Sequence, residues 1–243
     1  MVQSMADSIE AAALLYRWPK AAEFGRVVPK NKFYENGQVM ATVKEKFVDE
    51  VQRITWAYKL AESTINLPGT KALLELQVFQ IDAKGDDVSG AVLTAIDKAV
   101  RTPIIFEITR GNADFQQTRM VAAHKHLGPG APKVGAYFTT SWQGAETGRV
   151  PIPPAISLPT LYAALLEPLL PVAARPGEEL SEVTARIEAA RQLEREIGTL
   201  ERKIRNEPQL NRKVEWRRAL KTKQGSLADL TSQTPGAMPR TKN

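Results

Sequence analysis

An acidic and a basic residue stand two positions apart at the end of the clearest strand that the sequence predicts. This strand covers residues 73–84, with Asp82 and Lys84 just before a turn at Gly85. Side chains two apart on a strand point the same way. A carboxylate beside an ammonium is typical of restriction-endonuclease-type nucleases, where the acid holds Mg²⁺ and the lysine orients water. Glu50, in a predicted helix, could be the second acidic ligand, and Glu107 is another option.

The same residues also fit a solvated strand end followed by a turn, because acid-x-lysine tripeptides are common. The two histidines, His124 and His126, have a spacing that would let them share a metal on one strand face, but no further ligand stands nearby in the sequence. Nucleotide-binding P-loops and the motifs GxSxG, HExxH and GxGxxG are absent from the sequence. The sequence thus predicts no cofactor, with Mg²⁺ only under the nuclease alternative.

The largest local charge excess lies in a predicted helix near the C-terminal end. Residues 205–223 hold seven Lys or Arg and two Glu, which gives +5 of the chain's net +6. Such a cluster can bind the phosphates of DNA or RNA, and Trp216 within it could stack on a base or anchor the helix. The alternative is the solvated face of a coiled coil. The candidate nucleic-acid-binding residues are Arg212, Lys213, Arg217 and Arg218.

The predicted elements alternate between strands and helices. The strand at 73–84 is followed by a helix whose buried stripe includes Val88, Val92 and Ile96, and then by a strand at 104–109. This βαβ-like unit favours an α/β (or α+β) fold with a compact mixed sheet flanked by helices. Further elements are expected as a helix from Thr42, strands at 53–60, 115–123 and 134–140, and a helix at 160–170.

The composition changes at residues 176–177, and the next 40 residues are rich in Glu, Arg, Leu and Ala. Apolar residues there follow a heptad-like stripe, which must be covered by a second helix, a second copy of the chain or a partner protein. A break at residues 206–208 leaves a hairpin and a continuous kinked helix as alternatives, with Leu210, Val214 and Leu220 as the apolar stripe of the second helix. The candidate partner-binding residues are Leu193, Ile197, Leu200 and Ile204.

The predicted organisation has four parts. They are an irregular lead-in at 1–40 with a loop at 24–34, an α/β domain at 41–172, a charged helical tail at 178–223, and a disordered segment at 224–243. The 243 residues include no Cys, which excludes disulfide scaffolds and Cys-ligated zinc. No apolar run approaches the ~18 residues of a membrane span. The first residues lack early Lys or Arg, unlike a signal peptide, so we expect a cytoplasmic protein with no membrane partner.

Several phrases of the sequence together resemble one bacterial family, catalogued as domain of unknown function 4391. The phrases include LYRWPKAAEFGRVVPKNKFYE at 15–35, LELQVFQI at 74–81, AYFTTSW at 136–142 and QLNRKVEWRRALK at 209–221. The resemblance runs from residue 15 to about residue 220. It implies a compact α/β domain with a charged helical tail, often encoded beside superfamily 2 helicases and DNA methyltransferases. It supplies no catalytic residues.

Our functional hypothesis is an accessory, non-catalytic subunit of a bacterial defence system of the restriction type. The tail would dock a helicase or a DNA methyltransferase and contact DNA or RNA. The alternative is a Mg²⁺-dependent nuclease that uses Asp82, Lys84 and Glu50. A third possibility is a structural protein that forms homo-oligomers through its tail.

Overall fold

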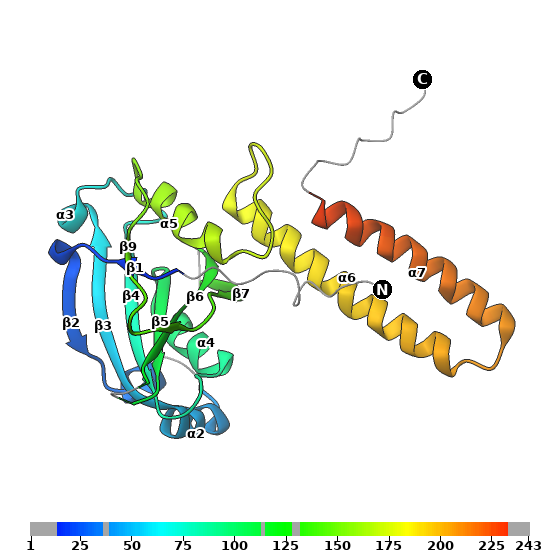
Figure 1. The fold of residues 1–243 in the computed structure, drawn as a ribbon, viewed down its shortest axis with the longest axis horizontal. Coiled ribbons are helices and arrows are strands. Elements are labelled where there is room, and N and C mark those ends of the chain that lie inside the picture. The colour runs from blue at the N-terminus through cyan, green and yellow to red at the C-terminus, as the bar shows by residue number, and fades with distance from the viewer. Residues whose placement is uncertain (1–13, 36–38, 113–114, 128–131, 233–243) are drawn as a thin grey trace. The chain divides into compact units, whose positions relative to one another are not determined.

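The computed structural model describes residues 14–35, 39–112, 115–127 and 132–232, which form two compact units. The boundary between the units falls between Leu170 and Pro171. The first unit contains a β-sheet with its covering helices, and the second contains two long helices (Figure 1). The predicted fold class, a mixed sheet flanked by helices and followed by a helical tail, is confirmed.

Seven strands form the main sheet of the first unit, with β2 at one edge (Figure 1). β4 and β5 are parallel and joined through α4 (Gly90–Ala99), so the predicted βαβ unit is confirmed. The other pairs are antiparallel. In spatial order the strands are β2 (Glu23–Val27), β3 (Val51–Ala61), β4 (Glu75–Ala83), β5 (Ile104–Arg110), β6 (Gln117–His126) and β7 (Lys133–Thr139), with β8 (Gln143–Gly144) also paired to β6.

One face of the sheet is covered by α1 (Asn31–Glu35), α2 (Ala41–Glu50) and α4. Phe47 of α2 and Ile96 of α4 are fully buried there against Phe79 of β4 and Phe106 of β5. Because side chains alternate along a strand, neighbouring residues such as Gln80 and Glu107 face the other way. The predicted stripe is confirmed, since Val92 and Ile96 of α4 and Val88, two residues before the helix, all belong to this core.

The opposite face carries α5 (Leu158–Leu166), which contacts β4 and β6. Ser157 caps α5 by accepting a hydrogen bond from the Thr160 N–H group, and Leu158, Leu161 and Leu165 are fully buried. β1 (Tyr16–Arg17) and β9 (Val150–Pro151) form a separate two-stranded parallel sheet. The remaining short elements are η1 (Lys20–Ala22), α3 (Glu62–Ile65) and η2 (Glu167–Leu169).

The expected loop at residues 24–34 is wrong at both ends, because Glu23–Val27 forms strand β2 and Asn31–Glu35 forms helix α1. All five residues of β2 are exposed, so the strand lacks the apolar alternation that reveals strands in a sequence. Gly25 has φ +63° beside a register shift in the pairing with β3, which is the conformation that glycine permits at a bulge.

A lysine is completely buried between β6 and α4. The Lys125 ammonium lies 2.6 Å from Asp97 Oδ1 and also donates to the backbone oxygens of Asp97, Val100 and Thr102 at 2.7–2.9 Å. Tyr137 donates to the second carboxylate oxygen of Asp97 at 2.8 Å. The cation therefore satisfies carbonyl groups at the C-terminal end of α4, where the helix dipole favours positive charge.

β6 bulges between Ala123 and Lys125, and the Tyr162 hydroxyl of α5 fills this bulge. It donates to the Ala123 carbonyl at 2.9 Å and accepts from the Lys125 N–H at 3.1 Å. His124 stacks on the Tyr162 ring, with ring centroids 6.1 Å apart. Burial, assisted by nearby His126, lowers the pKa of His124 from 6.5 to about 4.

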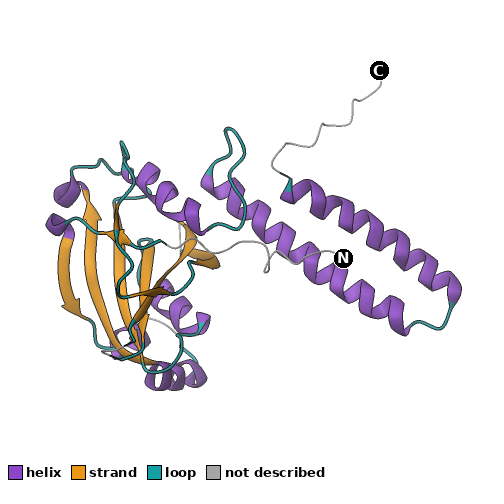
Figure 2. Cartoon of the chain, in the orientation of Figure 1, coloured by secondary structure: helices purple, strands orange, loops and turns teal. Residues whose placement is uncertain are grey.

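The second unit is an antiparallel hairpin of α6 (Leu180–Asn206) and α7 (Leu210–Thr231), shown in Figure 2. Of the two alternatives left open by the sequence, the hairpin is the observed one. Ala190 and Ile197 of α6 are buried against Leu227 of α7. Arg186 donates to the Leu230 carbonyl at 3.0 Å, and Arg175 donates to the carbonyls of Asp229 and Ser232, which satisfies the end of α7.

The expectation of disorder from residue 224 is wrong for residues 224–231, which continue α7. Leu227 and Leu230 extend its apolar stripe at the helical spacing, and two arginines cap its end, so this segment gains both burial and hydrogen bonds. Residues 233–243 of the predicted disordered segment lie outside the described residues.

His124 should make the stability of the first unit depend on pH. Its pKa is lower in the folded state, so the unfolded chain binds the proton first and stability is lost as the pH falls from about 6.5 toward 4. Allowing for the partial exposure of the ring, we expect a loss of about 2 kcal/mol, measured by urea unfolding at several pH values. The His124→Gln variant should show a flatter pH dependence, and His126→Gln should keep most of it. Parallel curves for His124→Gln and the wild type would contradict this assignment.

Candidate functional site

The three residues of the predicted nuclease site each bind other groups of the first unit. Arg53 of β3 lies across the strand from Asp82 and donates to its Oδ2 through two nitrogens, each at 2.8 Å. The Lys84 ammonium donates to the Val48 carbonyl of α2 at 2.6 Å. The Glu50 carboxylate accepts the Ser89 N–H at 2.7 Å, just before α4 begins.

These contacts point Asp82 and Lys84 in different directions. Ile81 and Ile54 pair on the face that α2 covers, so Asp82 and Arg53 lie on the opposite face. Lys84 instead reaches the C-terminal turn of α2, where Lys30 also donates to the carbonyls of Phe47 and Val51. Within the described ranges, no group of three or more His, Cys, Asp or Glu side chains is placed to hold a metal ion. The nuclease hypothesis gains no support from this geometry and stays a prediction.

Glu107, the other acidic option, lies in the centre of the sheet and is only 1% exposed. Its carboxylate accepts hydrogen bonds from Trp18 Nε1 at 2.7 Å, from Arg149 at 2.6 and 3.1 Å, and from Gln80 at 3.1 Å. Arg149 also donates to the Tyr16 carbonyl at 2.7 Å. This saturated carboxylate has the character of a structural anchor for the β1 and β9 segments.

Replacing Glu107 by Gln should therefore destabilise the first unit. The half-buried Arg149 guanidinium would lose its counter-ion, which costs about 3 kcal/mol for a buried pair. Urea unfolding measures the change. Glu75→Gln is the matched control, because the Glu75 side chain is 22% exposed, against 1% for Glu107, and its pair with Lys59 contributes at most about 1 kcal/mol. Equal losses in the two variants would show that the Glu107 ion pair does not hold this face together.

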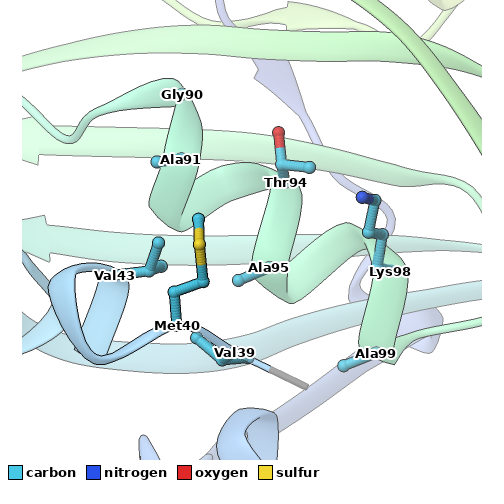
Figure 3. Close-up of a pocket in the computed structure, with 9 residues that line it drawn as sticks. All are labelled: Val39, Met40, Val43, Gly90, Ala91, Thr94, Ala95, Lys98 and Ala99. Carbon is cyan, nitrogen blue, oxygen red and sulfur yellow. The ribbon is translucent and has the colours of Figure 1, made fainter. Parts of the chain in front are cut away.

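A cavity of about 370 Å³ lies between the start of α2 and the outer side of α4 (Figure 3). Its wall is largely apolar, with Met40, Val43 and Ala95 among the lining side chains. Thr94 and Lys98 supply the polar side-chain atoms drawn in Figure 3. Among the described residues of its wall there is no carboxylate or imidazole, so Lys98 has no second titratable side chain beside it for acid–base or metal chemistry.

The predicted partner-binding stripe of α6 is largely occupied by α7. Ile197 is 6% exposed, and Leu193 packs with Leu220 and Leu230 around the same cluster. Leu200 and Ile204, nearer the tip, are partly buried. A partner could contact Ile197 only if the hairpin opened. Because α7 already covers the apolar stripe, the stripe no longer requires a partner protein to cover it.

The face of α7 that packs on α6 differs from the predicted one. Its least exposed residues recur at heptad spacing, and Leu210 and Val214 lie off this stripe, 69% and 39% exposed. Lysine stems and a tryptophan ring take the place of leucines near the tip. In chain order the stripe comprises Lys213, Trp216, Leu220, Lys223, Leu227 and Leu230.

The four predicted nucleic-acid-binding residues are distributed around α7. Lys213 and Arg217 are four residues apart on one side, and Lys221 extends this row by one more turn. Arg212 and Arg218 point elsewhere around the helix, and Arg212 lies 3.9 Å from Glu207. We call Lys213, Arg217 and Lys221 the basic row. Sequence analysis omitted Lys221 from the candidates, although its spacing from Arg217 could have identified it.

A groove of about 390 Å³ opens beside Trp216 at the tip of the hairpin. Thr199, Arg202, Lys203, Asn206 and Glu207 of α6 and the turn complete its wall. The Lys203 ammonium lies 6.0 Å from the centre of the Trp216 ring. Sequence analysis singled out Trp216 but not Arg202 or Lys203, because only the hairpin register brings α6 beside it.

Comparison with known protein families gives a match over most of the chain. The family model described as "Domain of unknown function (DUF4391)" matches residues 17–227. Searches of curated proteins and of solved structures gave no match. In the described part of the chain, no helix is both long and apolar enough to span a membrane.

Proposed function

The chain belongs to the DUF4391 family, and we propose that it is a non-catalytic accessory protein that binds nucleic acid through its C-terminal hairpin. In this proposal it serves a helicase- or DNA-methyltransferase-associated defence system of the restriction type. The observation that carries the proposal is the excess of positive charge in residues 199–223, around the tip of the hairpin. The sheet unit would be the folded platform from which the hairpin extends.

The charge distribution supports this proposal quantitatively. Residues 199–223 contain nine Lys or Arg and three Glu, a net charge of +6. The whole chain has 33 basic and 27 acidic residues, so the remaining sequence has 24 of each and is neutral. A local excess of this kind attracts polyanions, whereas a solvated coiled-coil face normally mixes both signs.

The cations of the basic row are available to a ligand. Within the described residues, neither Lys213 nor Arg217 nor Lys221 has an ion-pair partner, and Arg217 and Lys221 are exposed. Two other carboxylates of the tail are paired without involving the basic row, Glu178 with Arg186 at 2.7 Å and Glu196 with Lys223 at 2.6 Å. Phosphate groups would therefore meet cations that need not first release a carboxylate.

Neutralising the basic row should weaken nucleic-acid binding and reduce its salt dependence. For the triple variant Lys213→Gln, Arg217→Gln, Lys221→Gln we expect the slope of log K against log salt for duplex DNA to become shallower by about 3, one for each lost phosphate contact. Fluorescence anisotropy with a labelled duplex at several salt concentrations measures this slope.

The control replaces three exposed lysines of the sheet unit, Lys20, Lys71 and Lys133, by Gln. It removes the same charge, so it separates the effect of net charge from that of position. An equal change in the two triple variants, or no DNA retention by the wild type at low salt, would refute nucleic-acid binding by the hairpin.

Because α7 covers the apolar stripe of α6, we propose the tip of the hairpin as the surface that binds a partner protein. Leu210 and Val214 lie one turn apart on α7 and are exposed, so they offer apolar contact beside the basic row. Leu210→Asp should abolish co-purification of a helicase or DNA methyltransferase from the native cell, identified by mass spectrometry. Leu74→Asp is the control, since Leu74 is similarly exposed at 66% on the sheet unit. Recovery of the same enzyme with both variants would exclude Leu210 as the contact.

A further inference from the structure

We propose that the groove beside Trp216 accepts one unpaired base of a nucleic-acid strand, so that the hairpin binds single strands in preference to duplexes. This inference rests on the proposed function and assigns its ligand. It depends on the position of one aromatic ring, whereas the proposed function depends on charge.

Trp216 has the setting of a stacking platform. It occupies a stripe position of α7 where leucine would fill the seam, yet it remains partly exposed at the wall of a groove of about 390 Å³. That volume lies at the small end of the range for small-ligand pockets, which begins at about 300 Å³. An aromatic ring beside an open groove can stack on any base, because every base has a π-face.

The polar groups around the ring suit a nucleotide. Arg202 and Lys203 supply two cations for phosphates on the α6 side of the groove, and the Lys203 ammonium, which lies over the Trp216 ring, moves from the ring to a phosphate when a base stacks there. The negative charge of Glu207 is offset by Arg212 at 3.9 Å and by a hydrogen bond from the Gln209 N–H at 3.0 Å. Asn206 offers an amide donor and acceptor for base edges, while the Thr199 hydroxyl already donates to the Arg195 carbonyl at 2.9 Å. The wall is thus net positive, with an apolar surface at its centre.

The position of the ring favours an unpaired base. In a duplex both faces of each base are covered by neighbours, so a ring set in a groove can stack only on a base that has left the stack. The basic row runs along α7 over two further turns, which gives the rest of a strand a path along the hairpin. A free nucleotide would use the groove alone and would leave this row without a ligand.

The test compares a fluorescein-labelled oligothymidylate of about 16 nucleotides with a duplex of the same length. Trp216→Leu keeps an apolar residue in the seam, as at Leu220 and Leu227, and removes the aromatic ring. We expect its affinity for the single strand to fall on the order of 10-fold, with duplex affinity unchanged, and Trp216→Phe to retain most single-strand binding. An unlabelled oligothymidylate should quench the tryptophan emission of the wild type and not that of Trp216→Leu.

A second variant leaves the seam intact. Thr199→Leu fills the groove from an exposed position of α6 and should also weaken single-strand binding selectively. The inference is overturned if both variants bind the single strand as tightly as the wild type, or if quenching persists in Trp216→Leu. In that case a shallower salt slope in the basic-row variant would still support the proposed function. Absence of binding by the wild type to either probe would overturn both.

Discussion

The stability of the first unit depends on the hydrogen bonds and the ion pair that the buried Glu107 carboxylate forms. A charge in the middle of a sheet face must be neutralised, and its partners Trp18 and Arg149 come from segments far away in the sequence. The sheet can therefore bury this carboxylate only when the β1 and β9 segments already cover it. The ion pair of Glu107 therefore forms at the same time as the β1 and β9 segments pack on the sheet. These segments fold cooperatively with the sheet.

Lys125 plays the corresponding role on the other face, where it ends α4 and fixes β6 against it. Asp82, Glu50 and Lys84 are likewise used to join β3, α2 and α4. The charged groups that sequence spacing suggested for catalysis thus serve the architecture of the sheet unit. The excess of cations over carboxylates lies instead in residues 199–223 of the hairpin, which is why the hairpin carries the functional proposal.

Elements with a regular spacing of apolar residues could be predicted from the sequence. Features that depend on contacts between residues far apart in the sequence could not. The β4–α4–β5 unit was predictable because its apolar residues repeat at strand and helix spacing. β2 was not, because an edge strand whose five residues are all exposed has no apolar pattern. The pairing of Asp82 with Arg53 and the groove at Trp216 depend on strand and helix register, which local spacing does not fix.

The composition of the α7 stripe links the stability of the hairpin to its proposed function. Toward its base, Leu227 and Leu230 pack on α6, and Arg175 and Arg186 cap the helix end. Toward the tip, Lys213 and Trp216 occupy stripe positions where they gain less from burial than leucine would. Local stability should therefore decrease from base to tip. Because the contacts between α6 and α7 are weak at the tip, Trp216 can leave them and contact a ligand instead. The stronger contacts at the base keep the two helices in register.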